Sequence, residues 1–204
     1  MMNDLASTAI ASLGAMMALG YLLGSIPFGI ILTRMAGAGD LRTIGSGNIG
    51  ATNVLRTGRK GLAAATLLFD LGKGALAIAI AEAISPGAGP YAALGAFFGH
   101  LYPIWLKFNG GKGVATLLGI AIALYWPLGL VFALVWLAVA FASRYSSLGG
   151  IMAAVAMPVA AWWFGKEQAL WVFVVTLVFV VWKHRGNIQR LMAGTEPRIG
   201  KSKA

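Results

Sequence analysis

The sequence lacks cysteine and has few side chains that act as acids, bases or metal ligands. Only six of its 204 residues are carboxylates and only two are histidines. Without cysteine, the chain cannot form a disulfide, a thiolate nucleophile or a zinc–thiolate site. It has no G-x-S-x-G motif, no His followed five residues later by Asp, and no His/Glu cluster. We therefore expect no metal and no cofactor, and a site that works by binding and positioning anions.

Charged residues are also scarce. They make up 11% of the chain, against roughly a quarter in soluble domains, while 59% of the residues are hydrophobic. The apolar runs have the length of helices and lack the ten-residue alternation of a membrane β-barrel. We predict an all-α integral membrane protein in which residues 1–204 form a single transmembrane domain. Nucleic acid is not an expected partner, because no aromatic stacking platform accompanies the basic residues.

The hydrophobic runs predict seven transmembrane helices, and two prolines set their breaks. Pro27 removes a backbone donor, which predicts a kink in the first helix. The run 114–143 would be about 45 Å long as one helix, against a hydrocarbon core of roughly 30 Å, so we divide it at Pro127. The predicted helices cover approximately residues 6–32, 61–84, 91–108, 114–125, 127–143, 148–164 and 169–182. The N-terminal run lacks the cation of a signal peptide, so we expect the first helix to be retained.

The charge distribution supports this count and orients the chain. With seven spans and the N-terminus outside, fourteen of the sixteen Lys and Arg residues lie on one side of the membrane. Only Lys166 lies on the other side, and Lys73 lies within a span. Such asymmetry predicts that the basic side, with the C-terminus, is cytoplasmic.

Three polar, glycine-rich segments lie on this basic side: 40–60, 110–113 and 184–190. We expect folding to bring them together. Segment 40–60 contains a G-x-G-x-x-G pattern at residues 45–50, but no βαβ unit surrounds it, so a dinucleotide site is rejected. Its glycines can turn N–H groups inward beside short polar side chains, which suits an anion, and a flexible cytoplasmic loop is the alternative. The predicted substrate-binding residues here are Gly45, Ser46, Gly47, Asn48, Thr52 and Asn53.

The other two segments also admit two interpretations. Lys112 stands among glycines just before a helix, where its ammonium group, free N–H groups and the helix dipole suit a phosphate. A simple basic turn would look the same. His184 and Asn187 share a helix face, although Lys183, Arg185 and Arg190 also fit a membrane-surface anchor.

A few polar residues lie within predicted spans. Asp70 and Lys73 are one helical turn apart, so we predict a structural ion pair. We predict that His100 is a hydrogen-bonded core histidine. Ser25, beside Pro27, is either a helix-kink residue or a ligand contact at the mouth of the first helix.

Together these motifs resemble the bacterial acyl-phosphate:glycerol-3-phosphate acyltransferase family. The resemblance covers nearly the whole chain. It rests on SIPFG at 25–29, DLR at 40–42, GSGNIGATN at 45–53, DLGKG at 70–74, GH at 99–100, FNGGKGVAT at 108–116, and HRGNIQRL at 184–191 followed by Gly194 and Glu196.

This resemblance implies an activity, a location and roles for residues. The family transfers a fatty acyl group from acyl phosphate to the 1-hydroxyl of sn-glycerol 3-phosphate at the cytoplasmic side of the bacterial inner membrane. Its partners are the two substrates and membrane lipid. Ser25 and Arg42 match the essential first motif, and His184 and Asn187 match the polar pair of the third. Glu196 matches a position that serves structural integrity. The glycerol-phosphate loop is matched by Gly110, Gly111, Lys112 and Gly113.

We expect Arg42 and Lys112 to hold phosphates, with loop N–H groups neutralising charge in the transition state. The hydroxyl proton passes to the leaving phosphate or to His184, and the nearby Lys183 and Arg185 favour the phosphate. An anion transporter or lipid flippase is the competing hypothesis, but the chain shows no internal repeat and no second polar site on the outer side. A membrane scaffold would leave the glycine- and asparagine-rich loops without a purpose.

Overall fold

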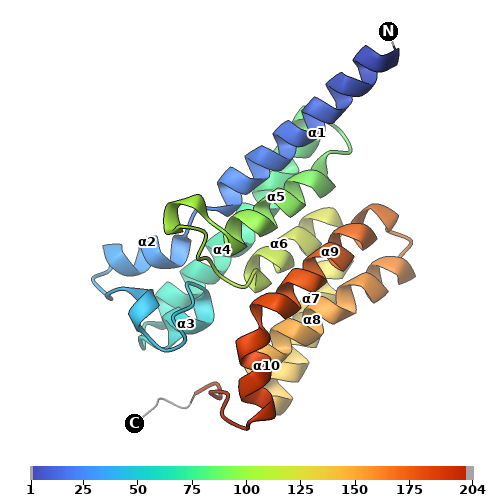
Figure 1. Cartoon of the computed structure of the whole chain (residues 1–204). Coiled ribbons are helices and arrows are strands. Elements are labelled where there is room, and N and C mark those ends of the chain that lie inside the picture. The colour runs from blue at the N-terminus through green and yellow to red at the C-terminus, as the bar shows by residue number, and fades with distance from the viewer. Residues whose placement is uncertain (1, 201–204) are drawn as a thin grey trace.

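The computed structural model describes the backbone of residues 2–200 and the side chains of residues 10–200. In this range all regular elements are helices (Figure 1). Lys201 and Lys203, two of the cations assigned to the cytoplasmic side, lie outside the described residues. The elements are α1 Met2–Gly24, α2 Phe28–Met35, η1 Leu41–Thr43, α3 Ala51–Leu55, α4 Lys60–Ile84, α5 Gly89–Leu101, η2 Ile104–Leu106, α6 Val114–Leu124, α7 Trp126–Ser143, α8 Ser146–Trp163, α9 Glu167–Lys183 and α10 Arg185–Met192.

Every predicted apolar run contains a helix, but the helices differ in length. By length and composition, four stretches of the described chain can cross a membrane: Ile10–Met35, α4, α7 and α8. The pair α9–α10, bent by 57°, would be a fifth. Helices α5 and α6 have 13 and 11 residues, which is about 20 and 17 Å of rise and shorter than the hydrocarbon core. Seven spans therefore stay a prediction.

Both predicted proline breaks are present. Helix α1 ends at Gly24, and α2 begins at Phe28, directly after Pro27. Tyr125 adopts an extended conformation between α6 and α7, and Pro127 lies in the first turn of α7. The predicted end of the third helix at residue 108 is wrong, because α5 ends at Leu101. Beyond it the chain turns through η2 and returns to the end of α5.

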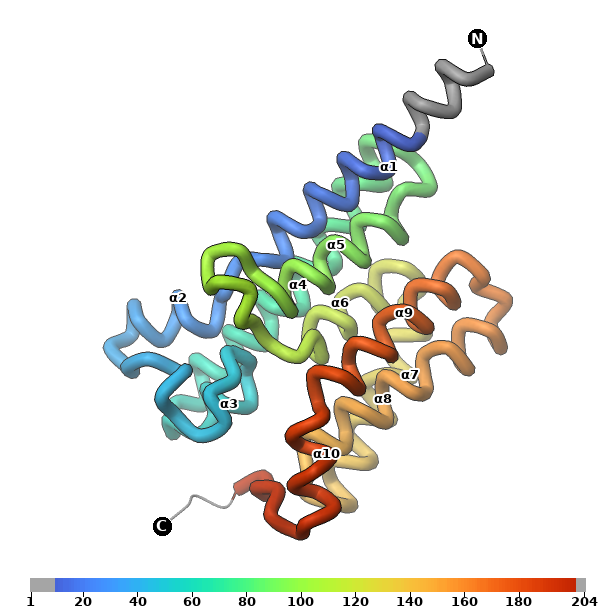
Figure 2. The backbone as a smooth tube through the Cα atoms, viewed as in Figure 1, coloured from blue at the N-terminus to red at the C-terminus, as the bar shows by residue number. Residues whose placement is uncertain are grey.

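Close backbone contact joins α1 to α5 (Figures 1 and 2). A Cβ atom on Gly20 would lie 2.2 Å from the Ala92 carbonyl oxygen, and one on Gly24 would lie 2.0 Å from that of Ala96. From the other side, a Cβ on Gly95 would lie 2.0 Å from the Met17 oxygen. Glycine is thus required on both helices, which is the small-residue packing typical of membrane helices.

Helix α6 joins two groups of helices. It packs against α4, which lies beside α1 and α5, and against α7, which packs on α8; α8 in turn packs on α9 (Figure 1). The main apolar cluster is formed by residues of α4 to α9, and Phe97, Phe132 and Phe173 are almost completely buried in it. The segment around α3, the loop between α5 and α6, and the α9–α10 bend lie at one end of this assembly (Figure 2).

Candidate active site

Lys112 lies in the loop between α5 and α6, and the packing of that loop depends on its glycines. The N–H groups of Gly110 and Gly111 donate to the Leu101 and His100 carbonyl oxygens, which close the end of α5. A Cβ on Gly111 would lie 2.1 Å from His100 Nε2. The expectation that the loop N–H groups are free is therefore wrong for these two glycines. The loop instead fixes Lys112 just before α6, whose N-terminus has no side-chain cap.

The Lys112 ammonium group is tied to α10. Lys112 Nζ donates to Asn187 Oδ1 at 2.5 Å, and Asn187 Nδ2 donates to Glu196 Oε1 at 2.6 Å. Arg190 Nε donates to Glu196 Oε2 at 2.8 Å, and Ser147 Oγ, in the first turn of α8, donates to Glu196 Oε1 at 2.6 Å. Asn187, Glu196 and Ser147 are all buried. A chain of hydrogen bonds therefore links the C-terminal segment to Lys112.

The charges around Lys112 set its protonation. Burial lowers the pKa of Lys112 to about 8; Glu196 opposes this shift, while Arg190, Arg56 and Lys183 reinforce it. Burial would raise the pKa of Glu196, but the hydrogen bonds from Ser147, Asn187 and Arg190 hold it below its ordinary value. At neutral pH Glu196 is therefore ionised, and it lies among several cations. Such an excess of positive charge suits a phosphate.

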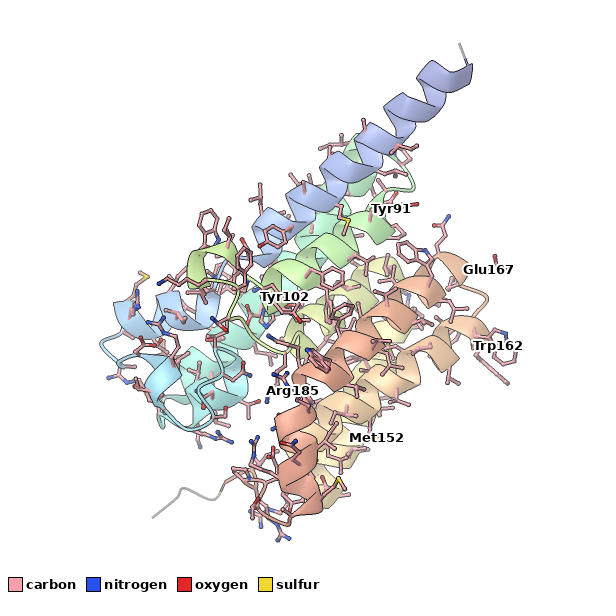
Figure 3. The ribbon with its side chains drawn as sticks, viewed as in Figure 1. Tyr91, Tyr102, Met152, Trp162, Glu167 and Arg185 are labelled. Atoms are coloured by element: carbon pink, nitrogen blue, oxygen red, sulfur yellow. The ribbon has the colours of Figure 1, made fainter. Side chains whose placement is uncertain are left out.

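Two cavities meet at Lys112. The larger, of about 300 Å³, is lined by Ser46, Lys112 and residues of the α9–α10 bend, among them Lys183, Arg185, Asn187 and Arg190. The smaller, of about 80 Å³, lies between residues 48–52 and the start of α6, with Asp70 and His100 on its wall. All three polar segments therefore border the same space, as predicted. Arg185 lies at the α9–α10 bend in Figure 3.

Segment 40–60 is folded around Asn53. Asn53 Nδ2 donates to the Leu41 and Ile44 carbonyl oxygens at 2.9 Å each, and its Oδ1 accepts from the N–H of Ser46 at 3.1 Å. Gly45 and Gly47 have φ of +56° and +69°, which favour glycine. Asn53 thus holds the loop, while Asn48, Thr52 and Ser46 reach the cavities.

Two residues that the family resemblance assigns to the site, Ser25 and Arg42, line neither cavity. Ser25 is buried; its hydroxyl donates to the Leu22 carbonyl oxygen and accepts from Trp105 Nε1, each at 2.8 Å. Arg42 is exposed and donates through Nε to both oxygens of Asp40 at 3.0 Å. This pairing raises the pKa of Arg42 and holds that of Asp40 well below its usual range. Neither side chain is directed at Lys112.

His184 lies in the bend between α9 and α10. It is 2% exposed, and its Nδ1 is 2.8 Å from the Val180 carbonyl oxygen. A carbonyl oxygen only accepts, so Nδ1 carries the hydrogen and the neutral ring presents an unprotonated Nε2. This nitrogen lies on the side of Gly150 in α8. The structure thus places His184 behind the cavities and Asn187 in the wall of the larger one.

The predicted ion pair is present. Lys73 Nζ lies 2.7 Å from Asp70 Oδ1 and donates to the Ile26 carbonyl oxygen at 3.0 Å. His100 is buried, as predicted, with Nδ1 at 3.6 Å from Asp70 Oδ1. That distance is too long for a hydrogen bond, so the predicted hydrogen bond of His100 is wrong for Nδ1, which has no hydrogen-bond partner among the described residues.

Sequence reasoning missed Ser147 and the contact of Lys183. Lys183 Nζ donates to the Leu101 carbonyl oxygen at 3.1 Å and lies 4.6 Å from the centre of the Tyr102 ring, beside the loop that Tyr102 begins (Figure 3). The sequence feature that could have indicated Ser147 is its position in the first turn of a helix, shortly after the basic Arg144. Its hydrogen bond to Glu196 could not be predicted, because that contact depends on the fold of the C-terminal segment.

Comparison with known proteins agrees with this architecture. The family model described as glycerol-3-phosphate acyltransferase matches residues 14–194. A glycerol-3-phosphate acyltransferase of Rhodopseudomonas palustris is 58% identical over 190 residues, covering 93% of this chain and 97% of its own. The glycerol-3-phosphate acyltransferase of Nitrobacter winogradskyi is 61% identical over 184 residues, covering 90% of this chain and 94% of its own.

Solved structures are also similar. The crystal structure of PlsY (YgiH), an integral membrane glycerol 3-phosphate acyltransferase, in its glycerol 3-phosphate form has a TM-score of 0.87 and 36% identity. It covers 93% of this chain and 96% of that one. The lysophosphatidic acid form of the same protein has a TM-score of 0.86 and 35% identity, with the same coverage of both chains. Fold and site define a multi-pass helical membrane protein with a cationic, phosphate-suited site at one end. The chain belongs to the glycerol-3-phosphate acyltransferase family.

Proposed function

We propose that the protein transfers a fatty acyl group from acyl phosphate to the 1-hydroxyl of sn-glycerol 3-phosphate, giving lysophosphatidic acid and inorganic phosphate for phospholipid synthesis. Family membership supports the acceptor. The observation that carries the proposal is that Lys112 borders both cavities, beside Arg190, Lys183 and Arg185. A single ammonium group there can serve two phosphate-bearing substrates.

The proposed reaction needs no nucleophile from the protein, because an acyl phosphate is already an activated mixed anhydride. The glycerol 3-phosphate hydroxyl oxygen attacks the acyl carbonyl carbon, the new ester C–O bond forms, and the bond from that carbon to the phosphate oxygen breaks. The departing phosphate takes the hydroxyl proton. The protein binds both substrates and stabilises the negative charge of the transition state.

Within this proposal the residues act in different ways. Lys112 binds phosphate in the larger cavity, with Arg185 and Arg190, and Asn187 holds its ammonium group in place. The polar residues 46–52 contact substrate from the opposite wall. His184 supports the bend that carries Asn187, because it is buried behind the cavity. For Ser25 and Arg42, which line neither cavity, the proposed role in the reaction rests on the family resemblance alone.

We further propose seven spans, with the N-terminus outside and the site on the cytoplasmic side of the bacterial inner membrane. The gathering of the basic segments at one end supports this orientation. It would give the site access to soluble glycerol 3-phosphate and the acyl chain access to lipid.

The test compares acyl donors. Purified protein in detergent or nanodiscs receives glycerol 3-phosphate with either palmitoyl phosphate or palmitoyl-CoA, and lysophosphatidic acid and free phosphate are measured. We expect equal amounts of the two products from palmitoyl phosphate and no lysophosphatidic acid from palmitoyl-CoA. Product from the thioester alone would overturn the proposed donor, and no product from either would overturn the activity.

A further inference from the structure

The C-terminal segment after α10 is attached to the corner between α7 and α8. The Ile199 N–H donates to the Arg144 carbonyl oxygen at 2.8 Å, and Arg144 Nη2 donates to the Ile199 oxygen at 3.2 Å. The Arg198 guanidinium group lies 5.5 Å from the Tyr145 ring centre. These contacts return the chain from α10 to the start of α8, and between them they place Glu196 beside Ser147.

Glu196 is held from three directions in this arrangement. Ser147 Oγ and Asn187 Nδ2 both donate to its Oε1 at 2.6 Å, and Arg190 Nε donates to its Oε2 at 2.8 Å. A carboxylate only accepts hydrogen bonds, so it selects the NH₂ group of Asn187. The amide oxygen of Asn187 must then face away from Glu196, toward Lys112 Nζ.

We propose that Ser147 and Glu196 are positioning residues for Lys112, acting through Asn187. Ser147 fixes the carboxylate, the carboxylate fixes the orientation of the Asn187 amide, and the amide oxygen holds the ammonium group where the two cavities meet. The substrate part of this inference, that the placement serves the binding of glycerol 3-phosphate, rests on the proposed function. The placement and charge of Lys112 can be measured without any substrate.

The proposal predicts a change in the titration of Lys112. Glu196 favours its ammonium form, whereas Arg190, Arg56 and Lys183 disfavour it. Asp70 and His100, from α4 and α5, line the smaller cavity that Lys112 also borders. Replacing Glu196 by Gln keeps acceptor and donor atoms near Ser147 and Asn187 but removes the carboxylate that acts to raise the pKa of Lys112. Its titration should therefore move to lower pH.

The experiment labels amines with acetic anhydride from pH 6 to 10 and follows the Lys112 peptide by mass spectrometry. Wild-type labelling should be half-maximal near pH 8, because only the free amine reacts. The midpoint should fall in Glu196→Gln and in Ser147→Ala, and Ser147→Thr should restore it. Ser143→Ala is the matched control, because Ser143 Oγ, at the same corner, donates to the Val139 oxygen and not to Glu196.

A kinetic readout accompanies the labelling. We expect Ser147→Ala to raise the KM for glycerol 3-phosphate about tenfold, the scale of a lost hydrogen bond to a charged group, with little change in kcat. An unchanged labelling midpoint in Glu196→Gln overturns the proposal, even if Ser147→Ala fails to fold. Equal midpoint shifts in Ser147→Ala and Ser143→Ala also overturn it. If the wild type shows no acyltransferase activity but the labelling midpoints of the variants shift as expected, the proposed function is overturned and the positioning role of Ser147 and Glu196 stands.

Discussion

Lys112 is the residue on which the proposed chemistry depends, and its protonation gives a testable pH profile. Its pKa is lowered to about 8, so the cationic form predominates below this pH and is lost above it. Because glycerol 3-phosphate is already a dianion above pH 7, we expect kcat/KM for this substrate to fall about tenfold per pH unit above pH 8. Steady-state kinetics from pH 7 to 10 measure the profile.

Lys112→Arg is the control for this profile, because a guanidinium group stays protonated throughout the range. Any activity that this variant retains should show no decline between pH 8 and 10. A wild-type rate that stays constant to pH 10 would contradict the assigned role of Lys112.

At the residue scale, the sequence predicted the kinds of side chain at the site better than their contacts. A lysine among glycines before a helix and an asparagine near a basic helix end could be recognised from local chemistry. The hydrogen bond between Trp105 and Ser25 could not be predicted, because it depends on how the chain after α5 folds back on α1. The same applies to Ser147 and Glu196, which are 49 residues apart.

The α1–α5 contact gives a prediction at the scale of elements. Gly20→Ala would place a Cβ 2.2 Å from the Ala92 oxygen, whereas Gly14→Ala on the same helix has nothing within 4 Å. We expect the first change to cost about 1–3 kcal/mol through overpacking. The second should be neutral or stabilising by up to about 1 kcal/mol. Thermal unfolding in detergent would measure both, and equal stabilities would refute the close packing.

The Asp70–Lys73 pair gives a second prediction for α4. Asp70→Asn leaves a buried ammonium group without its counter-ion, so we expect a loss of about 3–5 kcal/mol. Lys73→Met in the Asp70→Asn background removes that unpaired charge, so the double variant should be more stable than the Asp70→Asn variant. A double-mutant cycle on the free energy of unfolding measures the coupling. Simple additivity would show that the two side chains do not interact.

The elements also show which boundaries a sequence specifies. Pro27 and Pro127 mark breaks because proline lacks the N–H that a helix interior needs. The end of α5 was missed, because apolar residues continue through Ile104, Trp105 and Leu106 and keep the hydropathy high. Two things end the helix: Pro103 lacks the N–H and disfavours a helical conformation at Tyr102, and the returning loop donates the Gly110 and Gly111 N–H groups to the last carbonyl oxygens of α5.

At the scale of the whole molecule, the orientation in the membrane can be tested because the chain has no cysteine. Single cysteines at the exposed Lys60 and Ala193 should react with an impermeant maleimide only after the inner membrane of spheroplasts is opened. A cysteine at the exposed Lys166 should react in intact spheroplasts. Labelling of all three on the same side would contradict the proposed orientation. The gathering of the basic segments at one end was predictable from charge. It was not predictable that, within the described part of the chain, four or five helices have spanning length.

The most direct test of the central proposal is single-turnover phosphate release from palmitoyl phosphate, with and without glycerol 3-phosphate. Wild type is compared with Lys112→Ala and with Lys166→Ala, a lysine beside Tyr125 that borders neither cavity. We predict release that requires both substrates, is unchanged in Lys166→Ala, and is at least about a hundredfold slower in Lys112→Ala. Release that does not depend on glycerol 3-phosphate, or that continues at the wild-type rate in Lys112→Ala, would contradict the account.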